Sequence, residues 1–525
     1  MRIPFITKMR FSLLVIFIFI SNCVTAQGFK VRHSIPGASN NSASALYESS
    51  PGNYIAAGFI TDTSSGQAVR CISIMGLGSQ GQLLWTKKYK STSKINYLNN
   101  GFIQRCFYKQ GNFMYYAGCI NDSAGSQMGV FIKFTMSGDT LWQKTYRDTI
   151  DLIPQKVTGS MDGGFLMTGF FQDWINHTQQ GLILKTDANG NELWRKKINK
   201  SGQNVQDGKA IVQDSASKKI AIVGYQYFTS SDTHDNILIL DSLGNKKYQG
   251  TFCWSGVGGM GTDLIQTRDK KLVMIGCQYY PQIIGGNLNT SRSFAVKFDI
   301  DTPNIPIWKI DGYDILGITN FFATVVELNN EDILIGGALD SMQGVWNGSN
   351  NKPSNVLTRL TRVSKNGTIK WNRYYDYKTN NTLSDNIQGI HSIDVCQDGS
   401  WLASIEGINF PGVNPHLFVK YDSTGCDSTL AYCATLNLAG IKPYAQDNQI
   451  TLFPNPVADV LNIDISGLKT ENLALTLLDI HGREIKKLNL KEDQKIDVSD
   501  LNSGMYLIIF TKGKDLIHKE KLIKQ

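Results

Sequence analysis

The stretch that decides the fold runs from Asp162 to Ile198, with DGGFLMTGF at 162–170 and GLILKTDANGNELWRKKI at 181–198. Its order predicts a hairpin turn at Asp162 and an apolar strand that ends in Gly169. A second apolar strand follows, then a tight turn at Asp187–Gly190 and a last strand that carries Trp194. The stretch therefore reads as strands joined by short turns.

The same unit recurs along most of the chain. The apolar strand ending in glycine is found at Gly58, Gly118, Gly169, Gly224, Gly276 and Gly336, and in degenerate form at Ile405. An aromatic residue follows each of the first six, at Trp85, Trp142, Trp194, Tyr248, Trp308 and Trp371. Two landmarks that keep the same phase indicate an internal repeat with seven copies.

The strands of these repeats are nearly all apolar, which indicates sheets that are covered on both faces. The connections are short turns without helical periodicity, so helices cannot provide the cover. Sheets packed on sheets around an axis remain, and we expect an all-β fold, a seven-bladed β-propeller. The repeated glycine would sit where a side chain obstructs close packing, and the repeated tryptophan would cover the gap between blades.

The seventh repeat lacks its last strand, because nothing like LWTKKYK follows HLFVKYDSTGC. A segment of that character, Gly28–Ser34 (GFKVRHS), stands before the first repeat instead. We predict that it completes blade seven and closes the ring, which removes exposed sheet edges.

The N-terminus has the pattern of a signal peptide. Arg2, Lys8 and Arg10 precede the apolar run Phe11–Ile20, and Val24-Thr25-Ala26 follows with small residues. About 20 apolar residues are needed to span a bilayer, so this run is too short. We predict cleavage between Ala26 and Gln27.

A lipoprotein anchored through Cys23 is the alternative, although Asn22 stands where such a signal has Gly, Ala or Ser. No later segment is long and apolar enough for a transmembrane segment. The chain has 525 residues and a net charge of +8, without any run of Lys or Arg. This pattern excludes a nucleic-acid partner.

Eight cysteines remain after the predicted cleavage, and an exported chain permits disulfides. Only Cys426 and Cys433 are close in sequence, so we predict one bridge between them. The others lie on apolar strands, where buried free thiols are expected. No cysteine–histidine spacing typical of zinc occurs, and we expect no metal site.

The turn with Asp187, Gly190 and Trp194 resembles the tryptophan-docking turn of quinoprotein-like propellers, one residue shorter between Asp and Gly. In that family the motif is structural, and no cofactor signature accompanies it here, so we expect no cofactor. HExxH, GxSxG and P-loop motifs are also absent from the sequence. The catalytic residues, if any, are unknown, because carboxylates that converge from distant blades leave no local motif.

After residue 433 the repeats stop. Residues 434–448 read as a linker with Gly440 and Pro443. From Gln449 to Gln525 the strands alternate apolar and polar residues, which predicts a small antiparallel β-sandwich.

This C-terminal stretch carries four motifs in order. They comprise Pro454-Asn455-Pro456, then Gly482-Arg483, then Gly504 with Tyr506, and a lysine-rich end with Lys521. They resemble the type A C-terminal sorting domain of the Bacteroidetes type IX secretion system. The resemblance implies an export signal that the type IX machinery reads at the outer membrane. It also implies a secreted or outer-surface protein that is exported through the periplasm.

We therefore expect four parts: a signal peptide (1–26), the propeller (27–433), the linker (434–448) and the sorting domain (449–525). The propeller is expected to bind a surface glycan or a surface protein rather than to act as an enzyme. The alternative is a secreted polysaccharide hydrolase whose carboxylates meet at the propeller axis. A purely structural role in the surface layer is a third possibility.

Overall fold

The computed structural model describes residues 28–64, 66, 68–90, 97–98, 106–121, 125–198, 205–229, 232–252, 258–282, 288–311, 319–340, 356–375, 377, 388–407, 416–427, 450–454, 457–464, 473–478, 484–490, 494–512 and 515–524. Two compact units meet in the sequence between Cys433 and Ala434. No segment of the described ranges forms a helix with the length and hydropathy that a membrane crossing requires.

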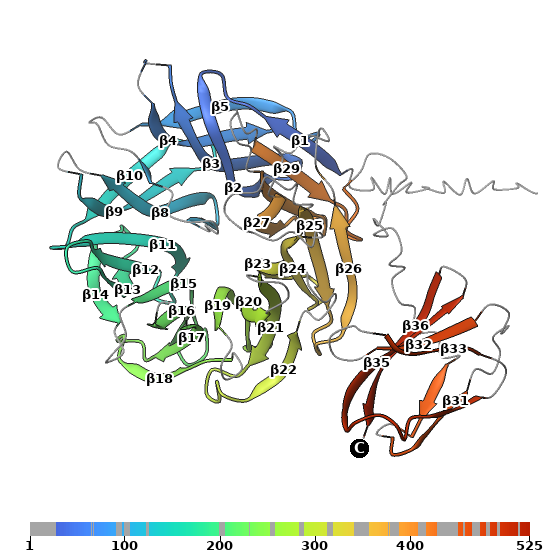
Figure 1. Cartoon of the computed structure of the whole chain (residues 1–525). Coiled ribbons are helices and arrows are strands. Elements are labelled where there is room, and N and C mark those ends of the chain that lie inside the picture. Colours follow the sequence, from blue (N-terminus) through green and yellow to red (C-terminus); the bar gives the residue numbers. More distant parts are fainter. Residues whose placement is uncertain are drawn as a thin grey trace, which may run out of the picture. The chain divides into compact units, whose positions relative to one another are not determined.

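Within the described residues, the first unit consists of seven antiparallel sheets that follow one another around a ring in chain order (Figure 1). Blade 1 comprises β2 (Ala38–Ser50), β3 (Asn53–Asp62), β4 (Val69–Leu77) and β5 (Leu83–Tyr89). Blade 2 comprises β6 (Tyr97–Leu98), β7 (Phe107–Gln110), β8 (Phe113–Asn121), β9 (Gln127–Thr135) and β10 (Thr140–Tyr146). Blade 3 comprises β11 (Asp151–Gly159), β12 (Phe165–Asp173), β13 (Thr178–Thr186) and β14 (Glu192–Ile198).

The remaining blades repeat this order. Blade 4 comprises β15 (Val205–Gln213), β16 (Ile220–Thr229), β17 (Asp232–Leu240) and β18 (Lys246–Gly250). Blade 5 comprises β19 (Gly258–Gln266), β20 (Leu272–Gln282), β21 (Leu288–Phe298) and β22 (Pro306–Asp311). Blade 6 comprises β23 (Thr319–Glu327), β24 (Ile333–Asp340), β25 (Val356–Val363) and β26 (Ile369–Tyr375). Blade 7 comprises β27 (Gln388–Val395), β28 (Trp401–Gly407), β29 (His416–Tyr421) and β1 (Phe29–His33). The predicted seven-bladed propeller is confirmed.

The N-terminal strand β1 closes the ring, as the sequence predicted. It pairs antiparallel with β29 from Phe29 opposite Lys420 to His33 opposite His416. Phe29 is buried, and His33 Nε2 lies 2.8 Å from the carbonyl oxygen of Gly81 in blade 1. The first and last described segments of the propeller therefore share one sheet and contact the next blade together.

The repeated glycine lies opposite a β-bulge in the innermost strand of its blade. In blade 3, Gly169 pairs with Pro154 just before a register shift, and a Cβ at Gly169 would overlap the carbonyl oxygen of Ile153. The same arrangement places Gly58 opposite Ala43, Gly224 opposite Gly208, Gly276 opposite Gly261, and Ile405 opposite Ile390. A bulge turns the backbone of one strand toward its neighbour, and a glycine leaves room for this approach in these blades, whereas blade 7 accommodates Ile405 at the same position.

In blade 6 both adjacent glycines are confined, since a Cβ on Gly336 would lie 2.8 Å from the side chains of Thr324 and Ile393. Gly337, rather than Gly336, pairs with Phe322 before the bulge, and a Cβ there would overlap the carbonyl oxygen of Phe321. The sequence offers two adjacent glycines at this point, and the hydrophobic pattern alone does not say which one faces the bulged carbonyl.

The repeated tryptophan packs on a turn of the following blade. A Cβ on Gly190, in the β13–β14 turn, would lie 2.8 Å from Cη2 of Trp142 on β10. Tyr146, four residues after Trp142 on the same strand, donates a hydrogen bond of 2.7 Å to the Gly190 carbonyl oxygen. The same ring-on-glycine contact joins Trp85 to Gly138, Trp194 to Gly244, and Trp308 to Gly367. The predicted inter-blade role of the tryptophan is confirmed at these four places.

The second unit is described here by itself. One sheet has the order β30 (Thr451–Phe453), β31 (Val460–Asp464), β34 (Gln494–Asp497). The other has the order β33 (Glu484–Asn489), β32 (Leu473–Leu478), β35 (Gly504–Lys512), β36 (Asp515–Lys524). Burial alternates along β32, and Leu461 and Ile496 of one sheet share a core with Leu475 and Phe510 of the other. The predicted small antiparallel sandwich is confirmed.

Candidate functional site

The propeller has two faces that differ in their connections. In an antiparallel blade, the links between first and second strands and between third and fourth strands leave from the same end. In blades 3 and 6 these links cover residues 160–164, 187–191, 328–332 and 364–368, five residues each, and across the blades they range from two residues (51–52) to seven (299–305). We call this end the constant face.

The opposite end carries the links between second and third strands and the links between blades. There the second-to-third link covers 174–177 in blade 3, 230–231 in blade 4 and 341–355 in blade 6. We call this end the variable face. A face whose loops differ from blade to blade is where a repeat protein gains specificity, since uniform turns serve the scaffold.

The constant face is locked by a repeated contact between neighbouring blades. A side chain at the end of the innermost strand accepts a hydrogen bond from a backbone N–H in a turn of the preceding blade. The four pairs are Gln213 with Met161, Gln266 with Ser215, Glu327 with Arg268, and Glu48 with Gln397. Because the side chain at this position accepts the same hydrogen bond in four blades, we assign these side chains to the scaffold.

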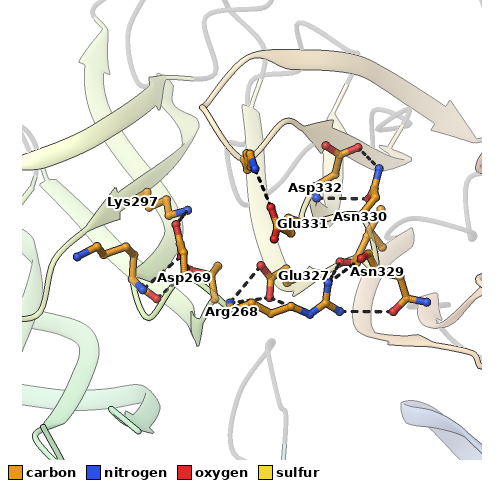
Figure 2. Close-up of polar contacts among 12 residues, drawn as sticks. Arg268, Asp269, Lys297, Glu327, Asn329, Asn330, Glu331 and Asp332 are labelled. Atoms are coloured by element: carbon orange, nitrogen blue, oxygen red, sulfur yellow. Dashed lines mark hydrogen bonds and ion pairs between the residues drawn. The ribbon is translucent and has the colours of Figure 1, made fainter. Parts of the chain in front are cut away.

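Figure 2 shows the version of this contact between blades 5 and 6. The backbone N–H of Arg268 donates to Glu327 at 2.9 Å, and its guanidinium donates to the carbonyl oxygens of Leu328 and Asn329 at 2.9 and 2.8 Å. Burial raises the pKa of Glu327, while the Arg268 N–H and charge act in the opposite direction. The carboxylate is held by the neighbouring turn and takes part in joining the two blades.

Charged side chains also meet across the innermost strands. Lys156 on β11 forms an ion pair with Asp263 on β19 at 3.3 Å, which joins blade 3 to blade 5. The other oxygen of the buried Asp263 carboxylate accepts the backbone N–H of Val325 at 2.9 Å. Both oxygens of this carboxylate are therefore committed to contacts within the ring.

Two further axial carboxylates each lie beside a lysine. Asp207 forms an ion pair of 2.7 Å with Lys209, which also donates to Gln155 at 3.0 Å. Asp394 lies 3.7 Å from Lys109, which joins blade 7 to blade 2. Burial raises the pKa of Asp394, and the nearby Lys109 charge opposes this rise.

No three His, Cys, Asp or Glu side chains within the described ranges are grouped so that they could hold a metal ion.

On the variable face, the β12–β13 hairpin of blade 3 presents an exposed tryptophan. Trp174 is 61% exposed and the adjacent Ile175 is 89% exposed. The indole Nε1–H of Trp174 donates a 2.8 Å hydrogen bond to Asp151 Oδ2. The other Asp151 oxygen accepts the backbone N–H of Gln127 in blade 2 at 2.9 Å. The ring is thus tied to two blades although most of it faces solvent.

The turn below this ring is also fixed. Asp173 accepts the backbone N–H groups of Ile175 and Asn176, each at 3.0 Å, and the Asn176 side-chain amide at 2.8 Å. The hydrogen bonds from Asn176 hold the pKa of Asp173 below its usual range. We call Trp174, Ile175 and Asn176 the blade 3 hairpin tip.

Several predicted functional residues lie outside the described residues. They are Ala26 and Gln27 at the predicted cleavage site, Asn455, Pro456, Gly482 and Arg483 of the sorting motifs, and Cys433. Cys426 is disulfide-bonded, and the predicted Cys426–Cys433 pairing stays a prediction. Five other cysteines are buried free thiols as predicted: Cys71, Cys106, Cys119, Cys277 and Cys396.

The remaining sorting-motif residues belong to the strands of the second unit. Pro454 follows the short strand β30 directly, and Gly504 and Tyr506 begin β35. Tyr506 donates a 2.9 Å hydrogen bond to the carbonyl oxygen of Asn502, and Lys521 pairs with Leu507 in the β35–β36 ladder.

A backbone bridge joins the segment after the first motif to the lysine-rich end, which is the last motif. Val457, one residue after the Pro454–Pro456 motif, forms a parallel bridge with Lys524, which in turn pairs with Gly504. Residues of two motifs, Gly504 and Lys524, are thus paired, and the residue that follows the first motif is bridged to Lys524.

A second repeated contact, an ion pair within a single blade, was not predicted from the sequence. A buried lysine near the end of the third strand pairs with the aspartate of the turn between first and second strands. The pairs are Lys185 with Asp162 at 2.8 Å, Lys297 with Asp269 at 2.7 Å, and Lys420 with Asp398 at 3.0 Å. The signal was present as a lysine two residues before the aspartate of the following turn, in LKTD, VKFD and VKYD.

The fold and these contacts define a repeat protein: a closed seven-bladed propeller with a separate C-terminal sandwich. Residues 451–525 match the family described as the secretion system C-terminal sorting domain. This match confirms the resemblance to the type IX sorting domain of Bacteroidetes secreted proteins. The protein is therefore exported, to the outer cell surface or the medium.

No curated protein matches the chain. Among solved structures, it is similar to a protein of unknown function from Dyadobacter fermentans, at 10% identity over 74% of this chain and 99% of that chain, with a TM-score of 0.39. It is also similar to the extracellular domain of a putative hybrid two-component system from B. thetaiotaomicron, at 10% identity over 94% of this chain and 73% of that chain, with a TM-score of 0.30. The β-propeller domain of the trilobed protease from Pyrococcus furiosus matches at 10% identity over 63% of this chain and 100% of that chain, with a TM-score of 0.29.

Proposed function

We propose that the propeller is a binding module that the sorting domain delivers to the outside of the cell, and that its ligand contacts the variable face. The ligand is a glycan or a protein of the cell surface. The observation that carries this proposal is the contrast between two ends of one ring. One end has links of two to seven residues and is locked by a repeated contact, whereas the second-to-third links at the other end range from two residues (230–231) to fifteen (341–355).

The axial carboxylates support binding over hydrolysis. A glycosidase needs two carboxyl groups that are free to face the scissile bond. Asp263 is held by Lys156 and by the Val325 N–H, and Asp207 is held by Lys209. Both oxygens of the Asp263 carboxylate are therefore occupied by contacts within the ring and are not free to face a substrate.

Export places the propeller outside the cell, where surface ligands are accessible. The sorting domain implies recognition by the secretion machinery. We further propose the boundaries 1–26 for a signal peptide cleaved between Ala26 and Gln27, 27–433 for the propeller, 434–448 for a linker and 449–525 for the sorting domain. A Cys426–Cys433 disulfide would tie off the chain where the propeller ends.

A cell-binding experiment tests the proposal. The mature chain is labelled and added to cells that lack their own copy, and bound protein is measured by flow cytometry. Binding that saturates is expected. Periodate treatment of the cells, which cleaves vicinal diols, removes a glycan ligand, whereas protease treatment removes a protein ligand.

Hydrolysis, the alternative function, can be measured on polysaccharide from the same cells. Surface polysaccharide is incubated with the protein, and new reducing ends are counted over time. Saturable binding without new reducing ends supports a binding module. Steady release of reducing ends, or no binding to any cells, would overturn it.

A further inference from the structure

We propose that the blade 3 hairpin tip is a carbohydrate-binding platform, on which Trp174 stacks against the apolar face of a sugar ring. The inference rests on the proposed binding function and names both its site and its ligand class.

The exposure of Trp174 is unusual for this chain. Among the tryptophans whose side chains are described, Trp85, Trp142, Trp194 and Trp371 are half-buried, Trp308 and Trp401 are buried, and only Trp174 is exposed. Single exposed apolar side chains are ordinary on a protein surface, so the weight of the inference rests on how the ring of Trp174 is held and on what surrounds it.

Hydrogen bonds fix the position of the Trp174 ring on the surface. Its indole N–H is bonded to Asp151, and Asp151 is bonded to the backbone of the neighbouring blade. The turn that carries it is fixed by three hydrogen bonds to Asp173. A ligand that stacks on a ring already in place loses little freedom in the protein, and this preorganisation favours binding.

The surroundings of the ring favour a sugar over an apolar peptide. A pyranose presents C–H groups on one face and hydroxyls around its edge, so it needs an aromatic face next to hydrogen-bonding groups. The same turn carries the exposed polar side chains of Asn176 and His177, and Ile175 is its one further exposed apolar side chain. A peptide-binding hot spot would instead sit within a larger desolvated apolar patch.

The charge of the tip points to a neutral glycan. Asp151 and Asp173 are the carboxylates at this hairpin, and both accept hydrogen bonds from the hairpin itself or from blade 2. Lys and Arg are absent from residues 170–180. An acidic polysaccharide would meet two negative charges at this hairpin.

Affinity electrophoresis of the full mature chain tests this inference. Native gels contain xylan, mannan or mixed-linkage β-glucan, and migration is compared with a gel without polysaccharide. Wild-type protein is expected to be retarded by at least one of the three. Trp174→Ala is expected to weaken the retardation about tenfold or more, whereas Trp174→Tyr keeps an aromatic face and retains part of it.

Leu141→Ala is the matched control, because Leu141 is 50% exposed but lies on the outer strand β10. Its retardation should equal that of wild type within about twofold, close to the spread expected for a surface substitution. Unchanged thermal unfolding of all three variants shows that the fold is intact.

The outcomes separate this inference from the proposed function. Wild-type retardation that Trp174→Ala leaves unchanged overturns the platform and leaves a glycan-binding propeller. No retardation in any of the three gels overturns the carbohydrate platform, while saturable binding to cells would still uphold the binding module. Release of reducing ends from the retarding polysaccharide would overturn the binding module itself.

Discussion

Trp142 on the outer strand of blade 2 lies directly over Gly190 in a turn of blade 3, so that a Cβ at Gly190 would fall 2.8 Å from the ring. Gly190 also has a φ of 76°, which L side chains rarely adopt. Gly190 is therefore constrained twice, by the positive φ of its own turn and by the close approach of Trp142 from the neighbouring blade.

Gly190→Ala should lower the free energy of unfolding by about 2–4 kcal/mol, because strain at positive φ adds to the clash with Trp142. Gly163 is the matched control, since its φ is 85° but no atom lies within 4 Å of its would-be Cβ. Gly163→Ala should cost only about 1 kcal/mol. Urea unfolding of both variants measures the difference, and equal losses would show that the ring contact contributes nothing.

Gly169→Ala tests the bulge contact without any strain in φ. A Cβ there would overlap the Ile153 carbonyl oxygen, which is backbone and cannot rotate away. We expect a loss of about 3 kcal/mol or more in the free energy of unfolding. Gly389→Ala, where the nearest atom to a Cβ is 3.4 Å away, should change stability by less than about 1 kcal/mol. If thermal unfolding shows Gly169→Ala to be as stable as Gly389→Ala, the close approach is wrong.

The Lys420–Asp398 pair should make stability depend on pH. Burial acts to raise the pKa of Asp398, but hydrogen bonds from Ser400 and the Lys420 charge outweigh burial and hold the pKa below its usual range. A carboxyl with a lowered pKa in the folded state adds stability above its unfolded pKa and loses it as the pH falls through the folded value. Stability should therefore fall as the pH drops below about 4.

Asp398→Asn and Lys420→Met should both weaken this fall, since each removes one partner of the pair. Unfolding in urea between about pH 5 and pH 3 measures the slope of stability against pH. A variant slope equal to that of wild type would exclude the pair as a source of the dependence.

Deletion of residues 27–36 should abolish cooperative unfolding of the propeller. Without β1, the edge of β29 is exposed and Gly81 loses its contacts with Phe29 and Val31. Circular dichroism and light scattering should show loss of the thermal transition and aggregation. A soluble deletion variant that melts cooperatively would refute the closure.

Removal of residues 449–525 should stop the protein from reaching the outer surface, because the sorting domain would no longer be present. Cell fractionation should then find the truncated chain in the periplasm. Normal release into the medium would contradict the role of this domain.

The propeller could be predicted because its repeated contacts are local in sequence. The strand-ending glycine and the aromatic residue, such as Gly169 and Trp194, follow one another in the same order in six repeats, 24 to 35 residues apart, so the copies reinforce one another. Closure by β1 was predictable because one strand was missing at one end and present at the other.

The choice between Gly336 and Gly337 was not predictable, since a bulge in β23 shifts the register without changing the hydrophobic pattern. Trp174 could not be recognised either. Its indole N–H is held by Asp151, a residue 23 positions earlier that the fold brings beside it. The axial pair of Lys156 and Asp263 joins two blades that are not adjacent, and no spacing in the sequence predicts it.

The most direct test of the account blocks each face of the propeller in turn. Ile175→Cys places a thiol on the variable face, and Leu243→Cys places one in the β17–β18 turn of the constant face, where Leu243 is 68% exposed. Each variant is coupled to a maleimide-polyethylene glycol chain, and binding to cells is measured before and after coupling. The polymer at position 175 should abolish binding of the protein to cells, while the polymer at position 243 should leave this binding intact. Binding that survives at position 175 and is lost at position 243 would contradict the account.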